Sequence, residues 1–193
     1  MSNLSVATFR AWKGNTTEPT DAVIQAAIDA AEESINDYCG RIIAVAGSSS
    51  ARSFAPAAPG ATLLFIDDCS AVSAVTEYGT SVDSTSYQLE PLNGRTSSGI
   101  VSPYTALRRY GIPWLWDMGF ARISVTATWG WTALPPRYTE ATKILTSDIL
   151  DQKNLQNGVI GFTEYAGVRV KANPMVSALL TGLRRTERTI GIA

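Results

Sequence analysis

A change in the spacing of apolar residues near residue 42, reversed near residue 135, most strongly constrains how this chain can fold. Before the change, the segment DAVIQAAIDAAEESINDYC places Ile24, Ile28 and Ile35 on one helical stripe. From residue 42 to 135, short β-branched or aromatic runs alternate with Gly, Pro, Ser and Asn, which is typical of strands and turns. Helical spacing then returns. The sequence therefore predicts an α+β fold, in which N- and C-terminal helices form a bundle that carries a β-rich, mostly antiparallel insertion.

Residues with known preferences for helix ends mark the limits of the predicted helices. Thr20 and Gly40 are favourable as the N-cap and the left-handed terminating residue of the first long helix. Pro136 is suited to the first position of a second helix that continues to about residue 154. Asn173 and Pro174 begin a last helix in the same way. An apolar turn carrying Val6, Phe9 and Trp12 precedes all of these.

Four runs in the central block have the composition of strands: 62–66, 71–78, 86–90 and 121–129. Asn93-Gly94, between Leu89 and Ile100, is a favourable hairpin turn. Residues 157–173 are predicted to form a glycine-spaced loop or irregular hairpin. We therefore divide the chain into N-terminal helices of the bundle (1–41), a β-rich insertion (42–135), and C-terminal helices with a docking tail (136–193).

The composition argues against most catalytic chemistry. Histidine is absent, which removes the commonest general base and the commonest transition-metal ligand. Cys39 and Cys69 are the only cysteines, and we expect both to be buried thiols. An enzyme acting through Asp67, Asp68 or Asp117 is an alternative class, but their spacing does not place two carboxylates in one cleft, and the first two favour a turn or a solvated edge. The prediction is that the protein has no catalytic residue, no metal site and no cofactor.

Two pairs of tryptophans are candidates for packing or recognition. Trp129 and Trp131 share the parity of Ile123 in ISVTATWGW, so we expect them to pack where the β-rich insertion meets the helices. Gly130 between them permits a bulge or a close backbone approach. Trp114 and Trp116, in GIPWLWDMGF, are candidates for a subunit contact as well as for the core. A carbohydrate-binding or tail-associated recognition module that uses exposed tryptophans is the alternative function.

Charge is unevenly distributed along a chain whose net charge is only −1. Residues 18–37 contain six carboxylates and no basic residue, so the polar face around Asp29, Glu32 and Glu33 is predicted to face solvent, a channel or a neighbouring subunit. The chain ends in an apolar stripe followed by arginines, and this segment suits a protein-docking arm, a solvated helix end or a DNA contact. The residues of this candidate docking segment are Val176, Leu179, Leu180, Leu183, Arg184, Arg185 and Arg188.

The order of these features resembles the head-to-tail connector (adaptor) proteins of long-tailed double-stranded DNA phages. The resemblance rests on INDYCGR, RSF, LLFIDDCSAVSAV, YQLEPLN, ISVTATWGWTALPP and NPMVSALLTGLRR, which span nearly the whole chain. A prophage or gene-transfer-agent relative fits the same pattern.

The resemblance implies a structural virion protein that forms a ring, twelve-fold in this family, beneath the portal protein at the capsid vertex. Such a ring extends the DNA channel toward a stopper or tail-completion protein, and DNA passes through it without sequence-specific binding. The family's C-terminal segment engages the portal, a role that falls here on residues 175–185, extending to Arg188. The expected location is the head-tail neck of the virion, after synthesis in the bacterial host cytoplasm, with no membrane contact.

Overall fold

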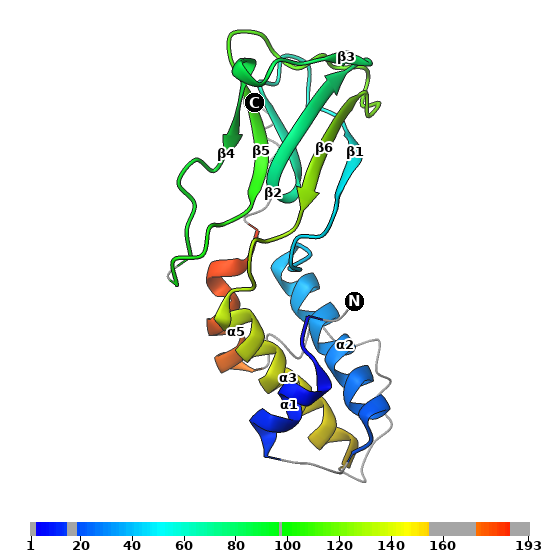
Figure 1. Ribbon diagram of the computed structural model, residues 1–193, viewed down its shortest axis with the longest axis vertical. Coiled ribbons are helices and arrows are strands. Elements are labelled where there is room, and N and C mark those ends of the chain that lie inside the picture. The colour runs from blue at the N-terminus through cyan, green and yellow to red at the C-terminus, as the bar shows by residue number, and fades with distance from the viewer. Residues whose placement is uncertain (1–2, 15–18, 97, 155–172, 186–193) are drawn as a thin grey trace. The chain divides into compact units, whose positions relative to one another are not determined.

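The computed structural model describes residues 3–14, 19–96, 98–154 and 173–185, and these fall into two units (Figure 1). The helical unit combines residues from both ends of the chain, up to Ile42 and from Leu134 onward. The β unit is Ile43–Ala133. The α+β fold class predicted from the sequence is confirmed.

The helical unit contains α1 (Val6–Lys13), α2 (Asp21–Cys39), α3 (Pro136–Asn154), α5 (Pro174–Leu180) and the 3-10 turn η2 (Thr181–Leu183). Helix α3 packs against α2 and α5, and α1 contacts α2 (Figure 1). The segment that the sequence predicted to be an apolar turn is therefore a helix, which Ser5 caps through a side-chain bond from the Thr8 N–H.

The predicted first long helix is confirmed as α2. Its buried residues include Ile24, Ile28 and Ile35, as the helical stripe requires. Gly40 terminates the helix with φ 63°, and its N–H donates to the carbonyls of Asn36 and Asp37. Thr20 lies at the N-cap position, but its side chain makes no capping hydrogen bond.

The last helix begins as predicted and ends earlier. The side-chain oxygen of Asn173 accepts from the N–H groups of Met175 and Val176, at 3.1 and 3.2 Å. The same amide donates to Asp148 of α3 at 2.7 Å. The α-helix stops at Leu180, and the chain continues to Leu183 as the 3-10 turn. The predicted loop at 157–172 lies outside the described residues.

The described strands of the β unit form one antiparallel sheet in the order β1-β6-β2-β5-β4, with the short strand β3 paired to β2. Its strands are β1 (Ser49–Phe54), β2 (Leu63–Glu77), β3 (Thr80–Ser81), β4 (Tyr87–Glu90), β5 (Tyr104–Arg109) and β6 (Ile123–Trp129), with the 3-10 turn η1 (Ser84–Ser86) before β4. Strands β1 and β5 were missed by the sequence analysis.

The two predicted strands 62–66 and 71–78 are a single long strand, β2. Asp67 and Asp68 therefore lie inside a strand, and the prediction of a turn there is wrong. Pairing with β5 shifts register between Phe65 and Cys69, and the part of β2 beyond this shift pairs with β6. β2 thus pairs with β5 along its first part and with β6 along its second. The irregular register near Asp67 and Asp68 bends the strand where a turn had been expected.

The predicted hairpin after β4 exists, but its turn lies further along the chain. Strands β4 and β5 are antiparallel, and the bridge Arg95–Val101 continues their connection. The chain reverses between the bridged residues Arg95 and Val101, and the Gly99 N–H donates to the Thr96 carbonyl at 2.9 Å. Gly99 has φ 80°, whereas Gly94 does not adopt a positive φ. Asn93-Gly94 is therefore not the turn.

Candidate interaction surfaces

A segment between β5 and β6, residues 110–122, is fixed to the end of the sheet by Glu77. The Glu77 carboxylate accepts from Arg109 Nη1 and from the Leu115 N–H, each at 2.7 Å. The Arg109 guanidinium also lies over the Trp114 ring, 4.9 Å from its centroid. Since Glu77 is only 8% exposed, this polar anchor is largely shielded from water.

Trp114 is part of the core, so the prediction of a subunit contact through its ring is wrong. The side chain is 1% exposed and packs in the cluster that contains Leu64, Leu107 and Val125. Its backbone N–H donates to the Ala61 carbonyl at 2.9 Å. Trp114 thus enters the core from the loop between β5 and β6 rather than from a strand.

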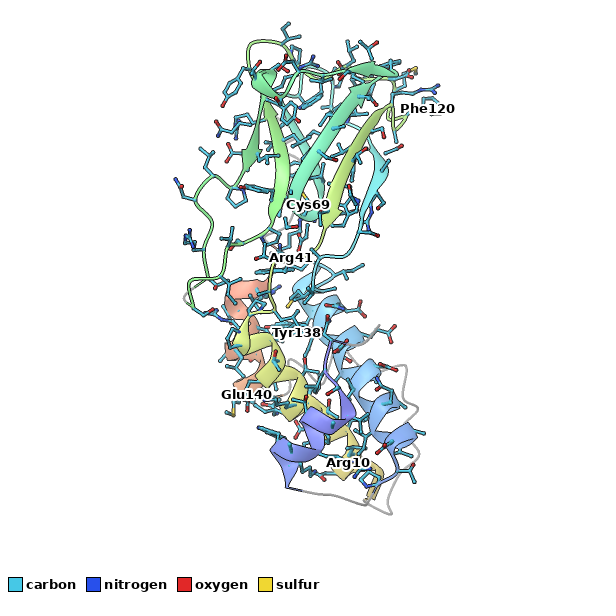
Figure 2. All side chains as sticks on the ribbon, viewed as in Figure 1. Arg10, Arg41, Cys69, Phe120, Tyr138 and Glu140 are labelled. Atoms are coloured by element: carbon cyan, nitrogen blue, oxygen red, sulfur yellow. The ribbon has the colours of Figure 1, made fainter. Side chains whose placement is uncertain are left out.

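The same segment exposes several large apolar side chains. They form the apolar patch, which we define as Ile112, Leu115, Trp116, Met118 and Phe120, with exposures from 41% to 79%. Figure 2 places Phe120 at the end of the β unit near β3. A concentration of exposed large apolar side chains in one short segment is typical of interaction sites in soluble proteins. Trp116 therefore remains a candidate contact residue.

Polar groups hold the backbone beneath the apolar patch. Asp117 pairs with Arg122 at 3.1 Å, and the Phe120 N–H donates to the Asp117 carbonyl at 2.7 Å. The Tyr78 N–H donates to the Arg122 carbonyl at 3.0 Å. Partial loss of hydration and the neighbouring Asp117 carboxylate raise the pKa of Tyr78. The backbone of the segment that carries the apolar patch is thus held by hydrogen bonds and an ion pair.

A second surface of the β unit is formed by small residues only. Pairing places Ala51 of β1 opposite Thr126 of β6, and Thr126 opposite Ala74 of β2. The rows on either side of this one contain Ser, Thr and Ala as well. The nine residues of this small-residue face, none of them buried, are Ser49, Ala51, Ser53, Ala71, Ala74, Thr76, Ser124, Thr126 and Thr128. Sequence reasoning missed this face because the register that aligns the three strands was not known.

Trp129 and Trp131 are both buried, and Trp129 belongs to the core cluster of the β unit. β6 alternates buried and half-buried residues, with Ile123 and Trp129 on the buried side. The Trp129 indole N–H donates to the Ser50 carbonyl at 2.9 Å. Gly130 has φ 116°, and a Cβ there would lie 2.7 Å from the Ala44 carbonyl oxygen. The close backbone approach expected at this glycine is therefore present.

Among Trp114, Trp116, Trp129 and Trp131, Trp116 alone is exposed. A carbohydrate platform needs several accessible rings, and these four side chains do not supply it. Two of the carboxylates considered for an enzyme are held in ion pairs: Asp67 with Arg52 at 2.9 Å, and Asp117 with Arg122 at 3.1 Å. Asp68 is buried.

The acidic face of α2 differs from the prediction at one position. Asp29 and Glu33 are exposed, as expected. Glu32 is 8% exposed and accepts from the N–H groups of Asn3, at 2.8 and 3.1 Å, and of Leu4, at 2.9 Å. Its predicted exposure to solvent, a channel or another subunit is wrong, because the carboxylate bonds the N-terminal backbone to α2 inside the helical unit.

Most apolar side chains of the candidate docking segment are buried within the helical unit. Val176, Leu180 and Leu183 are buried, whereas Leu179 is half-buried. The apolar stripe of this segment therefore packs within the helical unit, where α5 contacts α3.

The arginines at the end of this segment are closer to the surface. Arg184 is exposed, and its guanidinium lies over the Tyr38 ring at 5.1 Å. The Arg185 N–H donates to the Cys39 carbonyl at 2.8 Å. Arg188 lies outside the described residues. Arg184 thus remains available to a partner, while the backbone N–H of the next residue is bonded to the end of α2.

Both cysteines are buried free thiols, as predicted. Burial raises the pKa of Cys39 to about 11 and that of Cys69 to about 12, with the Asp68 and Asp67 carboxylates adding to the effect at Cys69. Within the described ranges, no helix is long and apolar enough to span a bilayer.

Three solved structures contain chains of similar fold. A chain in the neck of an empty GTA particle, solved with C6 symmetry, has a TM-score of 0.60 and 17% identity, covering 97% of this chain and 92% of its own. One in the neck of a native GTA particle, solved with C12 symmetry, has a TM-score of 0.57 and 16% identity, covering 96% and 91%. One in the virion of a native gene transfer agent (GTA) particle has a TM-score of 0.57 and 19% identity, covering 97% and 92%. No protein-family model and no curated protein matches the sequence.

Proposed function

We propose that this chain is a structural subunit of the neck of a tailed phage or gene-transfer-agent particle. In this proposal it forms a ring between the portal protein at the capsid vertex and the stopper or tail-completion protein, and the ring extends the DNA channel. The observation that supports it is the similarity of fold over 96–97% of the chain to chains from neck and virion structures. The features quoted from the sequence resemble a connector protein independently of that comparison.

A cyclic assembly is part of the proposal. Two of the similar chains belong to necks solved with C12 and C6 symmetry, which supports a homo-oligomeric ring, twelve-fold by the family resemblance. Such a ring requires a heterologous contact, in which one surface of each copy meets a different surface of the next. The apolar patch and the small-residue face are two different surfaces on one chain.

Portal docking is assigned to the arginines of the C-terminal segment. Because Val176, Leu180 and Leu183 are buried in the helical unit, their side chains contribute by placing the segment rather than by contacting the portal. Arg184, Arg185 and Arg188 would then pair with carboxylates of the portal, for which the planar guanidinium is well suited. Docking of this kind weakens as salt concentration rises.

The exposed acids of α2 are assigned to the channel. Asp29 and Glu33 are exposed on this helix, and negative charge there would prevent passing DNA from adhering. Reversing both residues to lysine should slow DNA release and leave ring assembly intact. Glu32 is excluded from this test because its carboxylate bonds the N-terminal backbone. Unchanged release kinetics would place these acids elsewhere than in the channel.

Reconstitution on capsids tests the function directly. The full-length protein would be added to portal-bearing, DNA-filled capsids that lack it, and the vertex would be imaged by electron microscopy. The expected result is a symmetric ring on the portal and recovery of tail attachment. A protein that binds neither portal nor tail would refute the proposal.

The docking segment can be tested in the same system. Replacing Arg184 and Arg185 by alanine should weaken attachment and reduce its dependence on salt, with helix content unchanged. Deleting residues 186–193, which retains the bond from Arg185 to Cys39, should abolish attachment if the tail carries the remaining contacts. Full-affinity binding by both variants would move the docking surface to another part of the chain.

A further inference from the structure

We propose that the apolar patch of one copy packs against the small-residue face of the next copy. This inference rests on the ring of the proposed function and names the two surfaces that meet in it. It assigns a contact role to Trp116, Met118 and Phe120 on one side and to the row Ala51–Thr126–Ala74 on the other.

The apolar patch is exposed in the single chain, and the backbone that carries it is anchored to the sheet. Met118 is 79% exposed, and Ile112 and Phe120 are each 63% exposed, so large apolar side chains stand in water in the single chain. The Glu77 anchor and the buried Trp114 ring hold the segment in place beneath them. A preordered apolar surface loses little conformational freedom on binding, which favours association.

The chemistry of this segment favours a protein partner over a membrane. Loops that bind membrane surfaces combine apolar side chains with lysines or arginines for anionic lipid headgroups. Residues 110–122 contain no lysine, and the charge of Arg122 is paired with Asp117. The segment is therefore mainly apolar, and its one positive charge, on Arg122, is neutralised by Asp117.

The small-residue face has the complementary character. A sheet face in water usually carries long polar or charged side chains, and these oppose the approach of another protein. Here the central row is Ala51, Thr126 and Ala74, whose short side chains allow bulky rings and thioethers to come close to the sheet. Beside it, the Ser73 hydroxyl already donates to the Thr126 carbonyl at 3.0 Å. Covering this face therefore displaces water without burying a charge.

A second copy is the occupant that both surfaces fit. The apolar patch and the small-residue face lie on different parts of one chain, so joining them between copies leaves one of each free at the ends of any open row. A contact of this type continues until its rotation closes a ring. Cyclic symmetry in the necks that contain similar folds agrees with such closure.

Site-specific photocrosslinking tests which surfaces meet. Met118 would be replaced by a benzophenone amino acid in the full-length protein, mixed with ¹⁵N-labelled protein and assembled on portal-bearing capsids. The expected products join position 118 of one copy to residues 49–54, 70–77 or 123–129 of a differently labelled copy. Crosslinks to the portal, to lipid, to residues 186–193 or to another part of the chain would overturn the inference. A missing ring in unmodified protein would instead refute the proposed function.

Charge substitution provides a second test. Ala74→Asp and Met118→Lys should each reduce the incorporation of copies into rings about tenfold or more, because each places an unpaired charge in the contact. The two substitutions together should restore incorporation, since the new charges then face each other. Ala57→Asp, at an exposed loop position of the same unit, is the matched control and should assemble normally. Normal assembly by both single variants, or no recovery in the double variant, would overturn the pairing of these surfaces.

Discussion

Glu77 and Arg109, the last residues of β2 and β5, form a 2.7 Å ion pair although β5 pairs only with the first half of β2. The pair is possible because β2 bends at the register shift between Phe65 and Cys69, which brings its far end back toward the end of β5. The ion pair therefore joins the end of β2 to Arg109, the residue directly before the segment that carries the apolar patch.

Removing the Glu77 carboxylate should destabilise the β unit. Glu77→Ala leaves the Arg109 guanidinium and the Leu115 N–H without this acceptor, and we expect a loss of about 3 kcal/mol in the free energy of unfolding. Urea unfolding measures it. Glu90→Ala is the control: its partner Arg108 is 47% exposed, so its loss should cost less than about 1 kcal/mol. Equal costs for the two variants would contradict the anchoring role of Glu77.

Glu32 should be essential for the order of the N-terminal residues. Glu32→Ala removes the acceptor for the N–H groups of Asn3 and Leu4, and a cost of about 2–3 kcal/mol is expected. Hydrogen exchange would show faster exchange at Leu4 and in α1. Glu33→Ala, on the exposed side of the same helix, should leave both stability and exchange nearly unchanged.

The two kinds of tryptophan should respond oppositely to truncation. Trp129→Ala removes a ring from the β-unit core and should cost about 3–5 kcal/mol. Trp116→Ala should change Tm little and reduce assembly instead, because this ring is 41% exposed. Calorimetry and ring incorporation measured on both variants separate the effects. An unchanged Tm for Trp129→Ala would show that its ring is not part of the core.

Gly130 should tolerate no side chain. Gly130→Ala would place a Cβ 2.7 Å from the Ala44 carbonyl oxygen at a φ of 116°, so we expect a loss of about 2 kcal/mol or more. Gly60 also has a positive φ, 76°, but has open space around it, and Gly60→Ala serves as the control for backbone strain alone. A larger cost at Gly60 than at Gly130 would contradict the role of close packing.

Alkaline pH should weaken the fold through the buried thiols. The pKa of Cys39 is raised to about 11 and that of Cys69 to about 12, so the unfolded chain releases these protons first as pH rises above 9.0. The unfolded state then binds fewer protons than the folded state, and the free energy of unfolding falls with pH up to these values. A Cys39→Ala, Cys69→Ala variant should show a shallower decline between pH 9 and 11 in urea unfolding. Identical slopes would show that other groups control it.

Elements with strong local signals were predictable from the sequence. The stripe through Ile24, Ile28 and Ile35 and the stop at Gly40 define α2 without any tertiary information. The alternation of Ile123 to Trp129 likewise defines one strand and its buried face. Asn173 and Pro174 identified the start of α5 because capping depends on adjacent residues.

The predictions that were wrong concerned residues whose structure depends on contacts with distant parts of the chain. Asp67 and Asp68 have the composition of a turn, but they lie between Phe65, which pairs with β5, and Cys69, which pairs with β5 and β6, so the strand continues through them. Glu32 has the sequence of an exposed acid, and only the return of Asn3 and Leu4 to α2 makes it a buried acceptor. The candidate surface formed by the small-residue face could not be predicted, because it exists only once three strands are aligned.

The division of the helical unit between the two ends of the chain has a consequence for synthesis on the ribosome. Helix α2 is made early, but its packing partner α3 follows only after the whole of Ile43–Ala133 has been translated. The described part of the β unit is contiguous in sequence and can complete its hydrogen bonding while α3 is still being made. The nascent chain must therefore carry the part of α2 that packs against α3 uncovered through that interval, so a slow-folding β unit would lengthen the period in which this helix is exposed to aggregation.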